Sequence, residues 1–199
     1  TNCTSPFTAK HHLPMTVQSH YVIAALRTPA KILQALNSPV HTVFLLAGNI
    51  CELPGQCLQL RNAGKMVFIH LDMLDGLKGD ASGLKFLQKF CSPNGVISTK
   101  AQVLKMAREL GLFTILRVFG LDSQAMRTGR EHVLLAKPDF VEVLPGVATK
   151  VITMAKQDYK VPIIAGGLIE TREDISQAFA AGANAVSTSN QMLWEQAPE

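Results

Sequence analysis

The sequence predicts a single-domain α/β protein, a compact (β/α)8 or TIM barrel with a parallel eight-stranded sheet. Its length of 199 residues suits one well-buried domain. Apolar residues make up 47% of the chain and charged residues 17%, as expected when strands are buried on both faces. Eight short apolar runs alternate with helical patterns at a spacing of roughly 20–25 residues, which is typical of repeated βαβ units.

The first half of the chain contains four strand-helix pairs. The strands are predicted at 21–27, 41–48, 66–72 and 95–99, and the helices at 29–37, 53–64, 80–91 and 100–111. Pro29 suits the first turn of a helix, where a backbone N–H would be unpaired anyway. Asp80 is placed to cap the third helix, and Gly64 and Gly111 mark the ends of the second and fourth.

The second half repeats the pattern. Its strands are predicted at 113–119, 140–146, 161–167 and 185–189, with helices at 123–137, 148–159 and 171–182. Pro138 and Gly182 end two of these helices, and Thr171 and Asp174 have the spacing of a capping box. Ser123 is expected to cap the helix that it begins. The eighth helix, after Trp194, is cut short.

Residues 1–20 are predicted to form a polar tail that precedes the barrel domain of residues 21–199. The sequence contains neither a membrane-spanning apolar run nor the apolar segment of a signal peptide. Its four cysteines lack the paired spacing of a zinc site, which indicates reduced thiols and a cytoplasmic protein without a metal. The net charge of +4 comes from scattered residues and is compatible with an anionic partner.

An open doubly wound sheet is the alternative fold. It is disfavoured because no GxGxxG motif follows the first predicted strand. The sequence also lacks the GxSxG, P-loop and HExxH motifs of several enzyme classes.

Polar residues gather toward the C-terminal ends of the predicted strands. Because side chains alternate along a strand, every second residue of a barrel strand faces the interior. The inward-facing sets with polar members are predicted to be Met66, Phe68, His70 and Asp72; Val96, Ser98 and Lys100; Ile115, Arg117 and Phe119; Phe140, Glu142 and Leu144; and Ala185, Ser187 and Ser189. Barrel interiors are packed mainly by branched apolar side chains, so these polar groups indicate a pocket.

A phosphate site is predicted at the ends of the last two strands. Gly166 and Gly167 end one strand, and Ser187, Thr188 and Ser189 end the other. Glycine makes backbone N–H groups accessible, and small hydroxyl groups near a helix start add donors. These residues predict the binding of a small phosphorylated metabolite.

Each polar residue also has a structural interpretation. His70 could be a hydrogen-bonded core residue, and Arg117 and Glu142 could form a buried ion pair that braces neighbouring strands. Lys100 could begin a helix and face solvent, or form a Schiff base if it is buried. From the residues alone, the barrel could be a phosphometabolite enzyme of the isomerase, aldolase or lyase type, or a protein that binds its metabolite as a signal.

Six segments at the ends of the predicted strands form a further pattern: FIHLDMLDGL (68–77), GVISTK (95–100), LRVFGLDS (116–123), VEVLPG (141–146), IIAGGLI (163–169) and AVSTSNQMLW (185–194). In this order and with this spacing, they resemble the GlpP family of glycerol uptake operon antiterminator regulatory proteins. The resemblance spans residues 22–194. It implies a non-enzymatic regulator without a cofactor that senses glycerol 3-phosphate and acts on leader mRNA, so that transcription passes a terminator.

The resemblance also implies where the effector lies. Its phosphate would bind near Gly166, Gly167 and residues 187–189. The rest of the pocket would be lined by His70, Asp72, Ser98, Lys100, Arg117 and Glu142. Carboxylates suit the hydroxyl groups of the glycerol part.

The RNA-contacting surface and the oligomeric state, including a homo-oligomer, are left open by the sequence. No RNP-like strand, KH loop or arginine-rich run is present. Cations that could touch RNA phosphates, or equally belong to solvated helix faces, are Lys78, Lys85, Lys89, Arg127 and Arg130.

Overall fold

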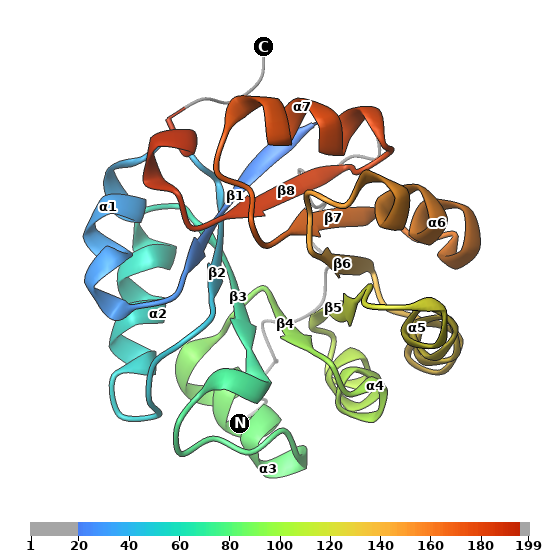
Figure 1. Cartoon of the computed structure of the whole chain (residues 1–199). Coiled ribbons are helices and arrows are strands. Elements are labelled where there is room, and N and C mark those ends of the chain that lie inside the picture. The colour runs from blue at the N-terminus through green and yellow to red at the C-terminus, as the bar shows by residue number, and fades with distance from the viewer. Residues whose placement is uncertain (1–19, 196–199) are drawn as a thin grey trace.

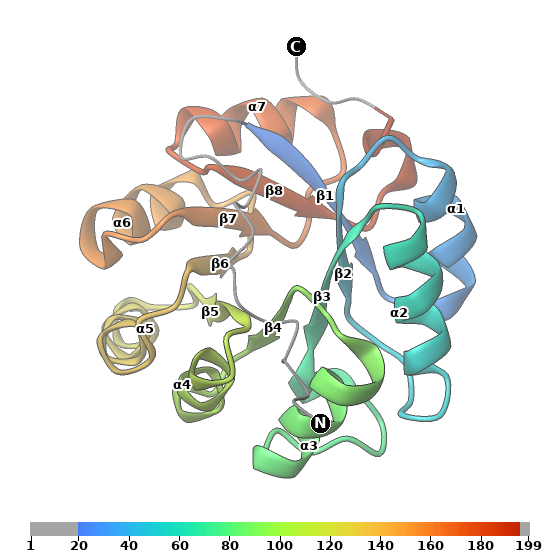
Figure 2. The ribbon, with the colours of Figure 1, turned by 180° about the vertical axis from the view of Figure 1, so that it is seen from behind.

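Eight short strands pair in sequence order, and the last pairs with the first, so that a parallel barrel closes (Figures 1 and 2). The computed structural model describes residues 20–195. The strands are β1 (Tyr21–Leu26), β2 (Thr42–Leu45), β3 (Met66–His70), β4 (Gly95–Ser98), β5 (Phe113–Phe119), β6 (Phe140–Leu144), β7 (Ile163–Gly166) and β8 (Ala185–Thr188). The predicted (β/α)8 fold is confirmed. The predicted tail lies outside the described residues except for His20.

Helices cover the outside of the barrel. They are α1 (Ile32–Asn37), α2 (Leu53–Asn62), α3 (Ala81–Phe86), α4 (Ala101–Glu109), α5 (Ser123–Ala136), α6 (Thr149–Tyr159) and α7 (Arg172–Ala180). A 3-10 turn, Pro29–Lys31, precedes α1, and a π-helical turn, Leu87–Cys91, extends α3. Within residues 20–195, no helix combines the length and apolar character needed to cross a bilayer.

The barrel interior is a small apolar cluster, separate from the larger layer between strands and helices. Its buried members are Ile23, Ala25, Phe44, Leu46, Phe68, Ile97, Ile115, Phe140, Ile164 and Ala185. The predicted inward faces of β5, β6 and β8 are confirmed by Ile115, Phe140 and Ala185.

The predicted inward face of β4 is wrong. Ile97 belongs to the interior cluster, whereas Val96 packs in the outer layer, which places Ser98 on the outer face as well. The reason is a neighbouring ring: a Cβ on Gly95 would lie 2.7 Å from the ring of Phe68. Phe68 therefore fills the inward space at the start of β4, and only glycine fits beside it.

The helix starts are held by side-chain caps. Asp80 accepts a hydrogen bond from the N–H of Gly83 at 2.9 Å, as predicted for α3. The capping box of Thr171 and Asp174 is confirmed at the start of α7. In α5 the cap is Asp122, which accepts from the N–H of Ala125, so the prediction for Ser123 is wrong.

Within residues 20–195, β8, which pairs with β1 to close the barrel, is followed by a short turn. A 3-10 turn, η4 (Gln191–Leu193), follows β8 and leads to Trp194, which is fully buried. The indole N–H of Trp194 donates to the carbonyl oxygen of Thr188 at 2.9 Å. This contact fixes the end of β8, where the predicted phosphate-binding residues lie.

Candidate functional site

A pocket of about 320 Å³ opens at the C-terminal ends of the strands. We call it the mouth pocket. It is lined by Ala25, Arg27, Leu46, Met73, Arg117, Phe119, Glu142, Leu144, Gly167, Leu168, Ile169, Glu170, Ser187, Thr188 and Ser189. Active and binding sites of (β/α)8 barrels lie at this end, because the loops after the strands converge there.

A buried polar network crosses one wall of the mouth pocket. Arg117 and Glu142 are directly paired in the register of β5 and β6, and the Nε of Arg117 donates to Oε2 of Glu142 at 2.7 Å. The hydroxyl of Ser187, on β8, donates to Oε1 of Glu142, also at 2.7 Å. The side chains of Arg117 and Glu142 are only 7% and 1% exposed. The ion pair suggested by the sequence is therefore present, and its members also line the pocket.

The two glycines at the end of β7, Gly166 and Gly167, have different roles. A Cβ on Gly166 would lie 2.6 Å from both Oε1 of Glu142 and Oγ of Ser187, so Gly166 makes room for the network. Gly167 lines the pocket with a left-handed φ of 80°. Leu168 follows with a φ of 61°, which is unfavourable for a branched side chain. Such strain is often retained at ligand-binding sites.

The end of β8 supplies the other predicted phosphate-binding residues. Ser187, Thr188 and Ser189 all line the mouth pocket. The hydroxyl of Thr188 donates to the carbonyl oxygen of Ile169 at 2.7 Å and ties β8 to the loop that precedes α7. Lys31 donates to the carbonyl oxygen of Ser189 at 2.8 Å and brings a cation to this side of the pocket.

His70 ends β3 inside the barrel and is 2% exposed. Neither ring nitrogen has a hydrogen-bond partner within residues 20–195. Burial lowers the pKa of His70 to about 4, and the positive charge of Arg117 acts in the same direction, against the carboxylates of Asp72 and Glu142. His70 is therefore a neutral imidazole near pH 7 with unused hydrogen-bonding capacity.

Asp72, Ser98 and Lys100 form a separate polar group outside the lining of the mouth pocket. Asp72 does not continue the inward face of β3, as the sequence suggested, because the chain turns into a 3-10 turn, Leu71–Met73. Its carboxylate accepts from the hydroxyl of Ser98 at 3.0 Å and from the N–H of Thr99 at 2.7 Å. Asp72 thus holds the end of β4 in place.

The electrostatics of this group are those of a partly solvated contact. Burial raises the pKa of Asp72, but hydrogen bonds from Thr99 and Ser98 outweigh it, so the pKa lies below its ordinary value. Lys100 lies 3.6 Å from Asp72, and its side chain is 67% exposed. Lys100 precedes α4 and faces solvent, which is the structural interpretation given to it above.

Several pocket residues were missed in the sequence, among them Arg27, Leu46, Met73 and Glu170. Arg27 follows β1 with the same parity as the inward-facing Ala25, so the alternation rule applied to the other strands would have identified it. Leu46 follows from the same rule on β2. Met73 ends the 3-10 turn after β3 and Glu170 lies in a loop, so strand alternation does not apply to either residue. Met73 is contacted by Arg117, whose NH1 lies 3.8 Å from the Met73 sulfur.

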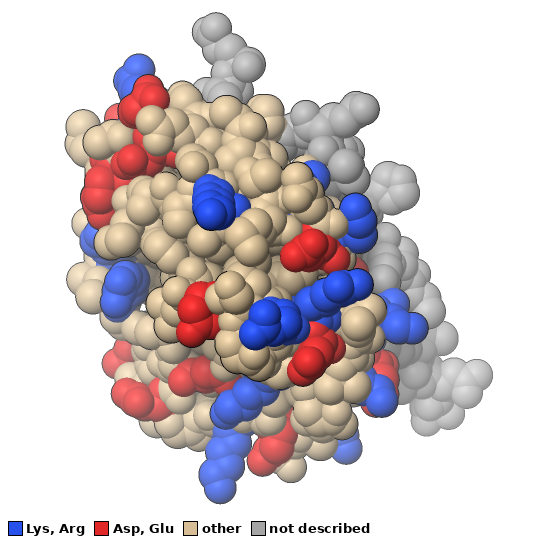
Figure 3. All heavy atoms as spheres, turned by 45° about the vertical axis from the view of Figure 1, so that its right-hand side comes forward, with Lys and Arg blue, Asp and Glu red and all other residues tan. Residues whose placement is uncertain are grey.

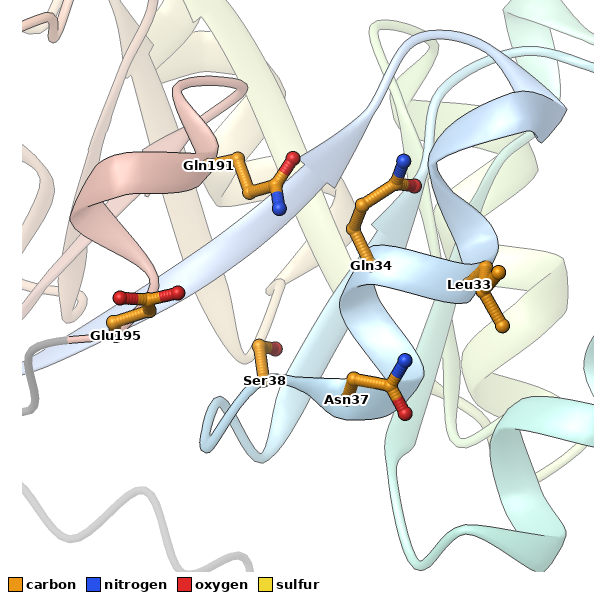
Figure 4. A pocket seen from close by; sticks show the side chains of 6 residues that line it. All are labelled: Leu33, Gln34, Asn37, Ser38, Gln191 and Glu195. Carbon is orange, nitrogen blue, oxygen red and sulfur yellow. The ribbon is translucent and has the colours of Figure 1, made fainter.

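A second hollow lies on the outside of the barrel, between α1 and the turn after β8 (Figure 4). It is lined by Leu33, Gln34, Asn37, Ser38, Gln191 and Glu195 and encloses about 200 Å³. Its lining consists of three amides, a leucine, a serine and a carboxylate, so it offers no cation to a phosphate. The mouth pocket is therefore the better candidate for the predicted ligand.

Residues 22–194 match the protein family described as glycerol-3-phosphate responsive antiterminator. The chain is 38% identical over 173 residues to the Escherichia coli (strain K12) protein described as uncharacterized protein YgcP, covering 87% of this chain and 91% of that protein. Solved structures of barrels such as aldolases share the fold at 16% identity or lower, which shows architecture alone.

Two solved structures are similar in both sequence and fold. The glycerol uptake operon antiterminator regulatory protein of Listeria monocytogenes is 34% identical with a TM-score of 0.86, covering 92% of this chain and 98% of that one. A glycerol uptake operon antiterminator-related protein of Thermotoga maritima is also 34% identical, with a TM-score of 0.78 and coverage of 89% and 99%. The chain therefore belongs to the glycerol-3-phosphate responsive antiterminator family.

Proposed function

We propose that this protein binds glycerol 3-phosphate in the mouth pocket and, when loaded, acts on leader mRNA in the cytoplasm so that transcription passes a terminator. The observation that carries the effector part is that two chemically distinct groups of residues line the pocket. The first group is Arg27, Ser189 and the left-handed turn at Gly167. The second is the network of Arg117, Glu142 and Ser187.

The first group of residues suits a phosphate. Arg27 supplies a cation, Lys31 holds the backbone of Ser189, and glycine at position 167 leaves the loop backbone open to a ligand. Backbone N–H groups and a guanidinium together form strong charge-assisted hydrogen bonds with a phosphate.

The second group of residues suits a polyol. Each carboxylate oxygen of Glu142 accepts one hydrogen bond from the protein. A carboxylate oxygen has a second lone pair, so Glu142 can also accept from ligand hydroxyl groups. Glycerol 3-phosphate presents a phosphate at one end and two hydroxyl groups at the other, in keeping with this division.

A Schiff-base enzyme of the aldolase type is less well supported. Such chemistry needs a lysine amine that is desolvated or placed beside another cation. The residues that line the mouth pocket do not include lysine, and Lys100 is 67% exposed beside a carboxylate.

The effector part is tested by thermal unfolding with glycerol 3-phosphate. The ligand is expected to raise the melting temperature of the wild type, because it binds the folded state only. Gly167→Leu should abolish this rise, since the substitution puts a side chain into the pocket at a left-handed φ, where a Cβ already lies 3.2 Å from Leu144. An equal rise in both proteins would refute the assignment of the pocket.

The RNA part is tested by a gel shift on the leader RNA of a glycerol-uptake operon, with and without glycerol 3-phosphate, over a salt series. Ligand-dependent binding that weakens as salt rises is expected, because phosphate contacts release counterions. A thermal shift without RNA binding would leave the protein as a metabolite sensor that acts through another partner.

A further inference from the structure

A groove of about 360 Å³ lies beside the mouth pocket, on the side of α5. We call it the α5 groove. Thr99 after β4 forms one edge, Phe119 and Leu121 at the end of β5 form the floor and rim, and one face of α5 forms the opposite wall. It shares Arg117 and Phe119 with the mouth pocket, and its other lining residues have no role in the effector binding proposed above.

The rim of the α5 groove is apolar and open to solvent. Phe119 is 45% exposed and Leu121 is 80% exposed. Phe119 offers an aromatic ring on which a flat nucleobase can stack, and Leu121, which lines the same groove, adds apolar surface.

The α5 wall is polar. Gln124, Thr128 and His132 follow one another at the spacing of a helical turn and all line the groove. Amide, hydroxyl and imidazole groups both donate and accept hydrogen bonds, as the edge of a base requires. Sequence-specific proteins read single-stranded RNA by this combination of stacking and hydrogen bonds to base edges.

The charges favour a base inside the groove and phosphates beside it. Asp122 lines the groove, and its carboxylate would repel a phosphate placed there. Two cations flank it: Lys100, adjacent to Thr99, and Arg127, whose NH2 donates to the side-chain oxygen of Gln124 at 2.7 Å. On the face shown in Figure 3, basic and acidic side chains are interspersed, so a uniform basic patch does not explain RNA binding there.

We propose that the α5 groove binds an unpaired nucleobase of the leader RNA, with the flanking phosphates beside Lys100 and Arg127. This inference rests on the proposed function, in which the protein acts on RNA. It also indicates a route from effector to RNA, because Arg117 and Phe119 line both the mouth pocket and the α5 groove. A ligand in the mouth pocket that contacts Arg117 therefore contacts a side chain that also lines the α5 groove.

The test compares two leucines with similar exposure. Leu121→Ala removes an apolar wall of the groove, whereas Leu134→Ala changes a 68% exposed leucine of α5 that does not line it. With leader RNA and saturating glycerol 3-phosphate, Leu121→Ala should weaken binding roughly tenfold, as expected for the loss of an aliphatic side chain that the base would bury. Leu134→Ala should bind as the wild type does, and both variants should keep the ligand-induced rise in melting temperature.

A crosslink locates the contact directly. Leader RNA that carries 4-thiouridine is irradiated in the presence of the wild-type protein, and the protein is then digested with trypsin. Trypsin cleaves after Arg117 and after Arg127 and so releases residues 118–127 as one peptide. RNA should be attached to this peptide.

The outcomes separate the two proposals. If both leucine variants bind leader RNA as the wild type does, and the crosslinks lie outside residues 118–127, the groove assignment is overturned and the proposed function stands. Equal weakening in both variants would also overturn it. A wild type that binds no leader RNA would refute the RNA part of the proposed function, and the groove assignment with it.

Discussion

Arg117 and Glu142 show how one pair of side chains combines stability with ligand binding. The pair is buried, and Ser187 satisfies the second carboxylate oxygen. Breaking a buried pair by removing one partner leaves an uncompensated charge, so Arg117→Ala should lower the free energy of unfolding by about 3–5 kcal/mol. Lys100→Ala, which breaks the exposed contact with Asp72, should cost under about 1 kcal/mol.

Urea unfolding of the two variants checks this contrast. Replacing both partners, as Arg117→Met with Glu142→Leu, should recover much of the lost stability because no buried charge remains unpaired. If Lys100→Ala proved as costly as Arg117→Ala, the buried network could not be the stronger of the two contacts.

His70 makes stability depend on pH. Its pKa is about 4 in the folded protein against an ordinary value of 6.5, so the unfolded chain binds a proton first as the pH falls. The stabilisation by neutral His70 is complete above about pH 6.5 and is lost progressively toward pH 4. Between pH 7 and pH 5 the loss should be about 2 kcal/mol.

The measurement is urea unfolding at pH 7 and pH 5 for the wild type and His70→Gln. Glutamine keeps a polar side chain but does not titrate, so the variant should lose less stability over this interval. The pKa of Asp72 in the folded protein lies below the ordinary value of an aspartate, so the contribution of Asp72 to the pH dependence of stability falls at lower pH. The same pH dependence in both proteins would mean that His70 titrates normally.

The capping box of α7 links a helix start to the mouth pocket. The side chains of Thr171 and Asp174 each accept from the other's backbone N–H, at 3.1 and 2.8 Å, and Asp174 also accepts from the N–H of Glu170. Glu170 lines the pocket. Thr171→Ala should cost about 1 kcal/mol of stability. It should also reduce the melting-temperature rise caused by glycerol 3-phosphate, because the loop loses its anchor.

Glu173→Ala is the matched control in the same turn. Its side chain contacts Gln177 on the exposed face of α7, away from the pocket loop. This variant should change stability by no more than about 0.5 kcal/mol and leave the ligand response intact. A reduced response in both variants would point to the whole helix instead of the capping box.

The elements were predictable from sequence because their signals are local. Strand periodicity, the cap at Asp80 and the capping box of α7 each depend on residues close together in the chain. The inward face of β4 was not predictable in this way, because it depends on Phe68 of another strand. The position of Asp72 was predicted wrongly for a related reason. β3 ends two residues earlier than predicted, and Asp72 lies in the 3-10 turn that follows, where its carboxylate accepts from the N–H of Thr99.

The site could be predicted only in part. Parity identified Arg117, Glu142 and Ser187, which lie on different strands and meet because the barrel closes. Loop residues such as Glu170 carry no periodic signal. That neither ring nitrogen of His70 has a hydrogen-bond partner within residues 20–195 likewise depends on its surroundings, which only the folded structure shows.

The closed barrel should unfold as one unit. Every strand is hydrogen-bonded on both sides, so the loss of any strand exposes two others. Trp194, the single tryptophan of the chain, is fully buried and bonded to Thr188 at the end of β8, the strand that meets β1 at the seam of the barrel. Trp194 therefore reports on the seam, whereas far-ultraviolet circular dichroism reports on all helices and strands.

A urea titration followed by both signals tests this expectation. If the seam is as stable as the rest, tryptophan fluorescence and circular dichroism should give the same midpoint, as two-state unfolding requires. Trp194→Ala should move the circular dichroism midpoint of the whole barrel to lower urea, since removing a buried tryptophan costs about 3–5 kcal/mol. A fluorescence change at lower urea than the change in circular dichroism would show instead that the barrel opens first at the seam between β8 and β1.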